Sequence, residues 1–273
     1  MIKLLDNAAA LNAFAESEPY WSALLAADGE VFLSEPELMK VWVEEENGEI
    51  AAVLRCDTDS LVLLTGGRMP STEMLLFVEK LLESGSIRSV HCEELTAAVL
   101  KNLHPFEETV EPLLAAEKPA EISSPKGFSL RENPPTEELF EIFVSVFGEE
   151  ERKEKELWEL KMKRGIAKGR VTVFSLYDGE KPAACAMIRS RIGRFGAIAC
   201  VITREEYRNR GCASFLTSLC RNRVLEEGKI PVLIPADSHA QKLYEKLGFR
   251  PVSDVYEEAG IPHVLMRLEE GNV

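Results

Sequence analysis

The stretch that decides the fold is Ala199–Leu216, with the sequence ACVITREEYRNRGCASFL. It begins with an apolar, partly β-branched run that ends at Thr203, and this run predicts a buried strand. A polar turn follows. From Cys212 onward apolar residues recur at helical spacing, which predicts an amphipathic helix. The stretch therefore contains a strand, a tight turn and a helix N-terminus in succession.

The turn has the composition of an anion-binding site. Gly211 would let a phosphate approach the backbone, and the small Ala213 keeps the first helical turn open. Asn209 tolerates a left-handed conformation, which suits a loop that curls around a diphosphate. The free N–H groups of the first helical turn and the helix dipole also favour negative charge. We therefore expect an anionic ligand here, with Arg208 and Arg210 beside it.

Two separate motifs resemble one family. Arg208-x-x-Gly211-x-Ala213, preceded by Val201-Ile-Thr203, resembles the pyrophosphate-binding signature of the GNAT superfamily of acyl-CoA-dependent N-acyltransferases. Ala240–Phe249, AQKLYEKLGF, resembles the family's A-x-x-L-Y-x-x-L-G-F segment, in the right order and at the right distance. The resemblance covers residues 128–268. It implies an α/β fold with a mixed sheet, the GNAT fold, in the C-terminal half.

The resemblance also implies acetyl-CoA as co-substrate and gives roles to particular residues. The positions expected to bind this cofactor are Val201, Ile202, Thr203, Arg208, Asn209, Arg210, Gly211, Cys212, Ala213 and Asp237. Val201 and Ile202 match the strand positions where a backbone N–H polarises the thioester carbonyl. Asp237 stands where the family commonly has an Asn that touches the pantetheine arm.

Tyr244 is the expected catalytic residue, because the resemblance gives it the protonation of the departing thiolate. A phenol can give up its proton to a thiolate and recover it from solvent. The alternative is a packed aromatic residue, since Tyr244 shares a helical face with Ala240, Leu243 and Leu247.

The general base is not identified from the sequence. The strand Phe195–Ile202 contains no carboxylate or histidine. Glu205 and Glu206 lie in the loop and are expected to be solvated surface charges. Asp237 and His239 could relay a proton to solvent, although an Asp at this position also fits a helix cap.

Length and composition predict two domains. With 273 residues and 45% hydrophobic residues the chain can build two cores of ordinary size. We expect a degenerate GNAT-like acidic α/β domain in residues 1–120, a linker in 121–127 and an acetyltransferase domain in 128–273. The stretch Glu117–Gly127 carries the Pro and Lys residues typical of a linker.

The first half shows the element order of an acyltransferase without its motif. Helices and an Asn47-Gly48 hairpin are followed by strand, helix, strand and helix. After the strand Leu61–Leu64 comes TGGRMP, residues 65–70, which is not R-x-x-G-x-A. Gly66-Gly67 could form an anion loop, but a turn into the helix Met74–Glu83, with Ser71 or Thr72 as its cap, is the simpler interpretation. In the second half, Asp178-Gly179 predicts another hairpin, and Gly260 predicts a turn between the last two strands.

Charge is distributed unevenly along the chain. The net charge is −14, and residues 1–125 hold 8 Lys and Arg against 23 Asp and Glu. Such an acidic half would repel nucleic acid and anionic membranes, so we expect neither as a partner. It could attract a cationic amine acceptor, or it could serve only solubility and packing. The alternating Glu/Lys run in Glu149–Lys168 is expected to be a solvated helix face.

The six cysteines show no C-x-x-C and no metal-ligand spacing. We expect no structural disulfide and no metal, and a reducing cytoplasm as the location, since no signal peptide or membrane-spanning run is evident. Two functions remain. One is an N-acetyltransferase that moves an acetyl group from acetyl-CoA to a primary amine of a small molecule or peptide, by direct attack in a ternary complex. The other is a non-catalytic acyl-CoA-binding regulator or scaffold. A homodimer is compatible with either.

Overall fold

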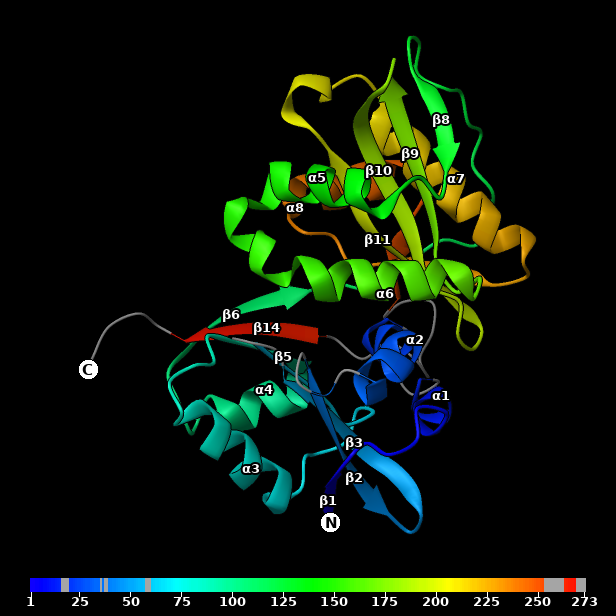
Figure 1. Cartoon of the computed structure of the whole chain (residues 1–273). Coiled ribbons are helices and arrows are strands. Elements are labelled where there is room, and N and C mark those ends of the chain that lie inside the picture. The colour runs from blue at the N-terminus through cyan, green and yellow to red at the C-terminus, as the bar shows by residue number, and fades with distance from the viewer. Residues whose placement is uncertain (16–19, 35, 37–38, 57–59, 253–262, 269–273) are drawn as a thin grey trace. The chain divides into compact units, whose positions relative to one another are not determined.

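Two seven-stranded mixed sheets organise the chain in the computed structural model (Figure 1). The structure describes residues 1–15, 20–34, 36, 39–56, 60–252 and 263–268. The chain divides into two compact units. The first unit contains Met1–Leu113 and Pro251–Val273, and the second contains Leu114–Arg250.

The first unit is built on the sheet β1-β2-β3-β4-β5-β14-β6, in which only β4 and β5 run parallel among the pairs described. Its strands are β1 (Ile2–Leu4), β2 (Lys40–Glu46), β3 (Glu49–Cys56), β4 (Ser60–Leu64), β5 (Ser89–Glu93), β6 (Phe106–Glu111) and β14 (His263–Leu268). Its helices are α1 (Ala10–Phe14), α2 (Trp21–Ser34), α3 (Thr72–Leu82) and α4 (Glu94–Leu100).

Both faces of this sheet are covered, as the apolar strands require. Leu61 and Leu63 pack with α3 and α4 in one core. Val62 and Leu64 point to the opposite face because side chains alternate along a strand, and they too are fully buried. On that face Trp21 of α2 lies 4.8 Å from the ring of His91.

The second unit is built on the sheet β13-β7-β12-β11-β10-β9-β8. Its strands are β7 (Leu114–Ala115), β8 (Ser129–Glu132), β9 (Thr172–Asp178), β10 (Lys181–Ser190), β11 (Phe195–Thr203), β12 (Ile230–Leu233) and β13 (Arg250–Pro251). Its helices are α5 (Thr136–Phe147), α6 (Lys155–Ala167), α7 (Cys212–Glu226) and α8 (Ser238–Lys246), with short 3₁₀ turns η1 (Glu149–Glu154) and η2 (Glu205–Tyr207).

Two cores sandwich this sheet, and Figure 1 shows α5 and α6 on one side of it and α7 and α8 on the other. Ile198 of β11 packs with α7 and α8. Ile202 packs with α5 and α6. The strand stretch predicted from the sequence is thus a central strand that is buried on both faces.

Two strands, β14 and β7, do not follow the predicted boundary at residues 121–127. β14 comes from the C-terminal end of the chain, yet it lies between β5 and β6 in the sheet of the first unit. β7 comes just after β6, yet it pairs with β12 in the second sheet. The segment expected to close the C-terminal domain therefore completes the other sheet. The predicted turn at Gly260 lies outside the described residues.

The first part of the predicted linker is tied to α7. Asn222 accepts from the backbone N–H of Ala120 and donates to its carbonyl, both at 2.8 Å. The buried guanidinium of Arg221 donates to the carbonyls of Lys118 and Leu247. These bonds give the linker a fixed path along one helix.

The local turn predictions are confirmed. Asn47 and Gly48 both have positive φ, 53° and 86°, as the hairpin between β2 and β3 requires. Ser71 caps α3 by accepting from the N–H of Met74 at 3.0 Å. The strand β6 was missed, because its sequence FEETVE lacks the apolar alternation of a strand.

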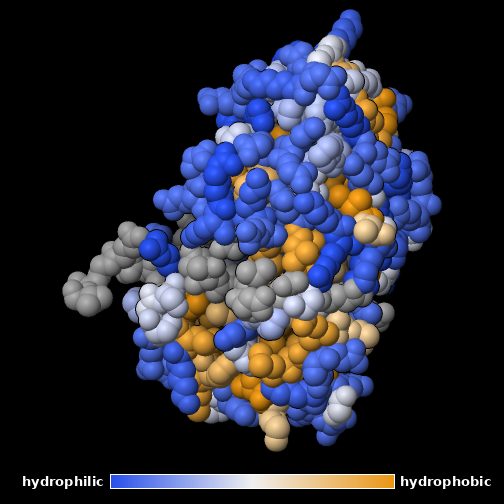
Figure 2. All heavy atoms as spheres, in the orientation of Figure 1, coloured by the Kyte–Doolittle hydropathy of each residue, from blue (hydrophilic) through white to orange (hydrophobic). Residues whose placement is uncertain are grey.

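Among the described residues no helix is both long enough and apolar enough to cross a membrane. Figure 2 shows mostly hydrophilic atoms over the elements of the second unit and larger hydrophobic areas over those of the first. The exposed apolar side chains of the first unit include Leu76, Leu95 and Leu103.

Candidate functional site

A gap between β11 and β12 forms the centre of the candidate site. The two strands pair in parallel only at Phe195–Ala197, opposite Ile230–Val232. β11 then continues to Thr203 with β10 as its only described strand neighbour. On the other edge the backbone groups of residues 198–203 are left for a ligand, since buried peptide groups need a partner.

The direction of the amides in this gap follows from one hydrogen bond. The N–H of Arg204 donates to the carbonyl of Ala183 on β10 at 3.0 Å. Because successive peptide groups of a strand point to opposite edges, the N–H of Ile202 also faces β10. The N–H of Thr203 then faces the gap. Before Ile202 the alternation is interrupted, because Cys200 has φ 51° and the register shifts between Cys185 and Met187. Of the two strand positions expected to bind the thioester, Ile202 is therefore the one whose N–H points away from the gap.

The loop after β11 has the conformation expected of an anion site. Asn209 has φ 61° and Gly211 has φ 81°, both in the left-handed region. A Cβ on Gly211 would meet no atom within 4 Å, so the space in front of this residue is open. The first intrahelical bond of α7 runs from the N–H of Phe215 to the Gly211 carbonyl, which leaves the N–H groups of residues 212–214 without a helical acceptor. The first turn of α7 carries no acidic residue.

The arginines of this loop are held by aromatic rings and the backbone. The Arg210 guanidinium lies 4.4 Å from the ring centre of Phe128 and 5.7 Å from that of Tyr207. Arg208 is exposed, and its Nε donates to the carbonyl of Thr203 at 3.4 Å. The loop thus combines oriented N–H groups with two positive charges.

Tyr244 lies in the core between β11 and α7 and is 7% exposed. Burial raises the pKa of its phenol to about 12, and the Asp237 carboxylate and the Cys200 and Cys220 thiols nearby add to the rise. Cys200 directly precedes Val201, so the structure brings Tyr244 to the strand that borders the gap. At neutral pH the phenol keeps its proton.

Asp237 occupies the N-cap of α8, where its carboxylate accepts from the N–H of Ala240 at 2.7 Å. Its side chain is exposed, as are those of His239, Glu205 and Glu206. Glu206 forms an ion pair with Lys181 at 2.8 Å. The cap interpretation of Asp237 is therefore the one that its contacts match.

The equivalent region of the first unit is closed. β4 and β5 pair in parallel as far as Leu63 and Cys92, one residue before β4 ends. The loop that follows is filled by the carboxyl of Glu93, which is fully buried. It accepts from the N–H of Thr65 at 2.8 and 2.9 Å, from the N–H of Gly67 at 3.1 Å and from the Thr65 hydroxyl at 2.6 Å. No sequence motif predicted the contacts of Glu93. Its place at the end of an apolar strand is the one signal that could have suggested a buried carboxyl.

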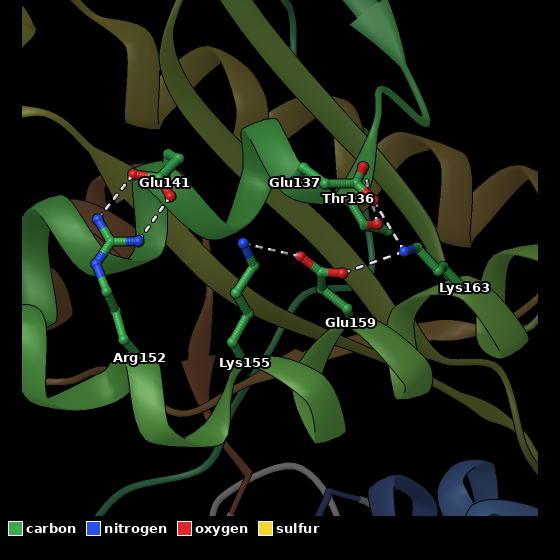
Figure 3. Close-up of polar contacts among 7 residues, drawn as sticks. All are labelled: Thr136, Glu137, Glu141, Arg152, Lys155, Glu159 and Lys163. Carbon is green, nitrogen blue, oxygen red and sulfur yellow. Dashed lines mark hydrogen bonds and ion pairs between the residues drawn. The ribbon is translucent and has the colours of Figure 1, made fainter.

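Charged residues of α5, η1 and α6 form ion pairs over the second unit, and Lys163 of α6 pairs with Glu137 of α5 at 2.8 Å (Figure 3). Arg152 forms a two-pronged ion pair with Glu141 at 2.8 and 3.0 Å. Glu159 lies between Lys155 and Lys163, at 3.7 and 3.1 Å. The predicted solvated face is thus a set of partly exposed ion pairs, each expected to contribute at most about 1 kcal/mol.

All six cysteines are free thiols, and among the described residues no group of three His, Cys, Asp or Glu could hold a metal ion. Cys200 and Cys56 are half-buried and the other four are buried. The polar chemistry of the site therefore comes from backbone N–H groups, arginines and one tyrosine.

Comparisons with known proteins bear on this geometry. Residues 141–270 match the family model described as an acetyltransferase (GNAT) domain. Protein ElaA of Escherichia coli (strain K12) is 51% identical over 39 residues, which cover 14% of this chain and 26% of that protein. The uncharacterized N-acetyltransferase YjcF of Bacillus subtilis (strain 168) is 27% identical over 92 residues, 33% of this chain and 65% of that protein. The chain thus spans about a quarter of one relative and just under two thirds of the other.

Solved structures extend the likeness to the whole chain. A tandem GNAT protein from the clavulanic acid biosynthesis pathway superposes with a TM-score of 0.65 at 11% identity, covering 100% of this chain and 99% of that one. At this identity the likeness shows the fold. Residues 141–270 are therefore similar to GNAT acetyltransferase domains, and the chain as a whole shares its fold with a tandem GNAT protein.

Proposed function

We propose that the chain is a cytoplasmic N-acetyltransferase that moves an acetyl group from acetyl-CoA to a primary amine of a small molecule or peptide. The observation that carries the proposal is the gap between β11 and β12, which opens onto the left-handed loop at Asn209 and Gly211. The first unit lacks this gap, because β4 and β5 stay paired and Glu93 fills the loop. Only the second unit would then bind the acyl donor.

In this proposal the diphosphate of acetyl-CoA binds the N–H groups of residues 211–213, with Arg208 and Arg210 adding positive charge. The pantetheine arm enters the gap, where the N–H of Thr203 bonds to it and Asp237 lies beside it. The N–H of Val201 donates to the thioester oxygen and stabilises the negative charge that develops during attack.

The amine nitrogen attacks the thioester carbonyl carbon within a ternary complex, and the carbon–sulfur bond breaks. The nitrogen loses a proton to solvent, and the departing thiolate accepts a hydrogen bond from the Tyr244 hydroxyl. With a phenol pKa of about 12 and a thiol pKa near 8.5, complete transfer costs about 5 kcal/mol, so we expect Tyr244 to act by a strong hydrogen bond to the sulfur. Solvent protonates the thiolate afterwards.

A non-catalytic acyl-CoA-binding regulator is the second candidate. One observation favours it: the strand Phe195–Thr203 carries no carboxylate or histidine to act as a base. Both candidates require the diphosphate loop, and only the first requires turnover.

The experiment that tests the proposal measures CoA release from acetyl-CoA against a panel of amines, peptides and aminoglycosides, with calorimetric titration of CoA in parallel. Release with one amine class supports the transferase, whereas CoA binding without release across the panel favours the regulator. Absence of CoA binding would overturn both.

The loop itself is tested by Gly211→Glu, which places a like charge at the diphosphate position. We expect the folded variant to lose CoA binding by more than about 100-fold. The matched control is Gly179→Glu at the β9–β10 hairpin, where φ is also positive, 60°, and nothing lies within 4 Å of a Cβ. CoA affinity unchanged in folded Gly211→Glu would contradict the site.

A further inference from the structure

At the end of the candidate strand, the side chain of Arg204 makes no hydrogen bond or ion pair with the residues that the structure describes. It directly follows Thr203, its backbone is fixed by the bond to Ala183, and its side chain is half-buried. Its Nε atom is enclosed and bonds to no atom in the described part of the chain. A buried donor of a charged group that stays unpaired is costly, so such a group is a candidate for ligand binding.

The carboxylates that face Arg204 are already engaged by other cations. Arg204 lies in electrostatic range of Glu141 and Glu206. Glu141 accepts two hydrogen bonds from Arg152, and Glu206 is paired with Lys181. The remaining cation near Glu141 is Lys155, which is paired with Glu159 (Figure 3). Arg152 is also paired with Glu149. Within the described residues each carboxylate named here is thus bonded to a cation other than Arg204.

The position of Arg204 places it on the acceptor side of the strand. Ile202, two residues earlier, packs with α5 and α6, and Arg204 follows it on the same face. The diphosphate loop leads into α7, which packs on the opposite face. Phe143 and Trp158, both half-buried, pack against the core on this face. An acceptor that approaches β11 from the α5–α6 side would meet this guanidinium.

We propose that the acceptor amine carries a carboxylate and that Arg204 binds it. A guanidinium matches a carboxylate with two parallel N–H···O bonds, and the donors of Arg204 are not used by the carboxylates of the described residues. This inference rests on the proposed transferase and names its substrate class: amino acids or acidic-ended peptides. It replaces the cationic acceptor that the acidic first half suggested.

The test compares matched acceptors, each amino acid or peptide as the free acid and as its amide, with wild-type protein, Arg204→Gln and Arg204→Lys. For the free acids we expect Arg204→Gln to raise the acceptor KM by about 10- to 100-fold, with partial rescue by Arg204→Lys. The KM for acetyl-CoA and the weaker rates with amides should stay unchanged. Lys153→Gln, which removes a positive charge from an exposed residue of the same unit, is the control and should change none of these values.

Calorimetric titration of the same acids into the CoA-loaded protein separates this inference from the proposed function. If wild type binds an acid and Arg204→Gln does not, the inference is supported, whether or not CoA is released. Absence of CoA release counts only against the transferase. Equal binding of acid and amide, no binding of either, or an equal loss of both in Arg204→Gln would overturn the inference.

Discussion

At the scale of single residues, Tyr244 is the test of catalysis. We expect Tyr244→Phe to lower kcat by about 100-fold at unchanged CoA affinity, because only the proton donor to the leaving sulfur is removed. The pKa of about 12 adds a pH signature, since the rate of the wild type should show no loss linked to this phenol below about pH 11. Single-turnover rates between pH 7 and 11 provide the measurement.

Tyr177→Phe is the matched control for Tyr244. Tyr177 is fully buried in the same unit, and its hydroxyl donates to Glu138 at 2.5 Å. This variant should lose stability and keep its turnover. Equal turnover by Tyr244→Phe and wild type would assign Tyr244 to the core alone.

Glu93 gives a residue-scale prediction for the first unit. Glu93→Ala leaves the N–H groups of Thr65 and Gly67 without their acceptor, so the free energy of unfolding should fall by about 2–4 kcal/mol at low pH. Burial raises the pKa of Glu93 in the folded state. The contribution of this carboxyl is therefore complete below its unfolded pKa of about 4.3 and declines as the pH rises through the folded value.

Urea unfolding of wild type and Glu93→Ala between pH 4 and 8 measures this difference. The neighbouring Glu94→Ala changes an exposed residue and should shift the free energy by less than about 0.5 kcal/mol. A loss for Glu93→Ala that grows with pH would contradict the assignment. CoA binding should persist in the variant, because the candidate loop belongs to the other unit.

At the scale of elements, α7 makes two kinds of contact. Its N-terminus lies at the open loop, and Arg221 and Asn222 in its middle bond to the backbone of Lys118 and Ala120. Arg221→Ala removes the donors to Lys118 and Leu247 and leaves two part-buried carbonyls without this donor. We expect a loss of about 2–3 kcal/mol in the stability of the second unit and faster hydrogen exchange at residues 117–120. Arg223→Ala, which breaks the partly exposed pair with Glu132 and the contact with the Phe174 ring but no bond to residues 117–120, should have a smaller effect on both measurements. Unchanged exchange in Arg221→Ala would mean that the linker is held by other contacts.

Sequence patterns predicted the elements whose causes are local. The hairpins at Asn47-Gly48 and Asp178-Gly179, the Ser71 cap and the strand before Arg204 all follow from a few neighbouring residues. β6 was not predicted, because its own sequence lacks apolar alternation and its partner, β14, comes from a distant part of the chain. The buried role of Glu93 also escaped, since the donors that it meets come from a loop 26 to 28 residues away. That the Arg204 side chain bonds to none of the described residues depends on side chains of α5, η1, α6, β10 and η2, and no sequence motif predicts it.

At the scale of the whole molecule, each sheet contains a strand from a distant part of the chain: β14 in the first sheet and β7 in the second. Leu265→Pro removes a backbone N–H from the middle of β14, which pairs with both β5 and β6. We expect a loss of about 3 kcal/mol or more in the stability of the first unit, with CoA binding by the second unit preserved. Circular dichroism and calorimetry measure the two effects.

Leu4→Pro is the control for this change. It alters an edge strand at a position whose N–H points away from β2, because the next residue, Leu5, donates to Val41. Its cost should be clearly smaller. Equal effects of the two substitutions would argue that β14 adds little to the first sheet.

The place of β14 also sets an order of events during synthesis. A ribosome makes the first unit's helices and most of its strands early, but residues 263–268 emerge last. Until then β5 has no neighbour on one side and β6 has no strand to join. All the strands of the second sheet, which end at β13, are available sooner. The part of the chain that is translated first is therefore the part that finishes folding last, in contrast to the usual N-terminal-first order of multidomain proteins.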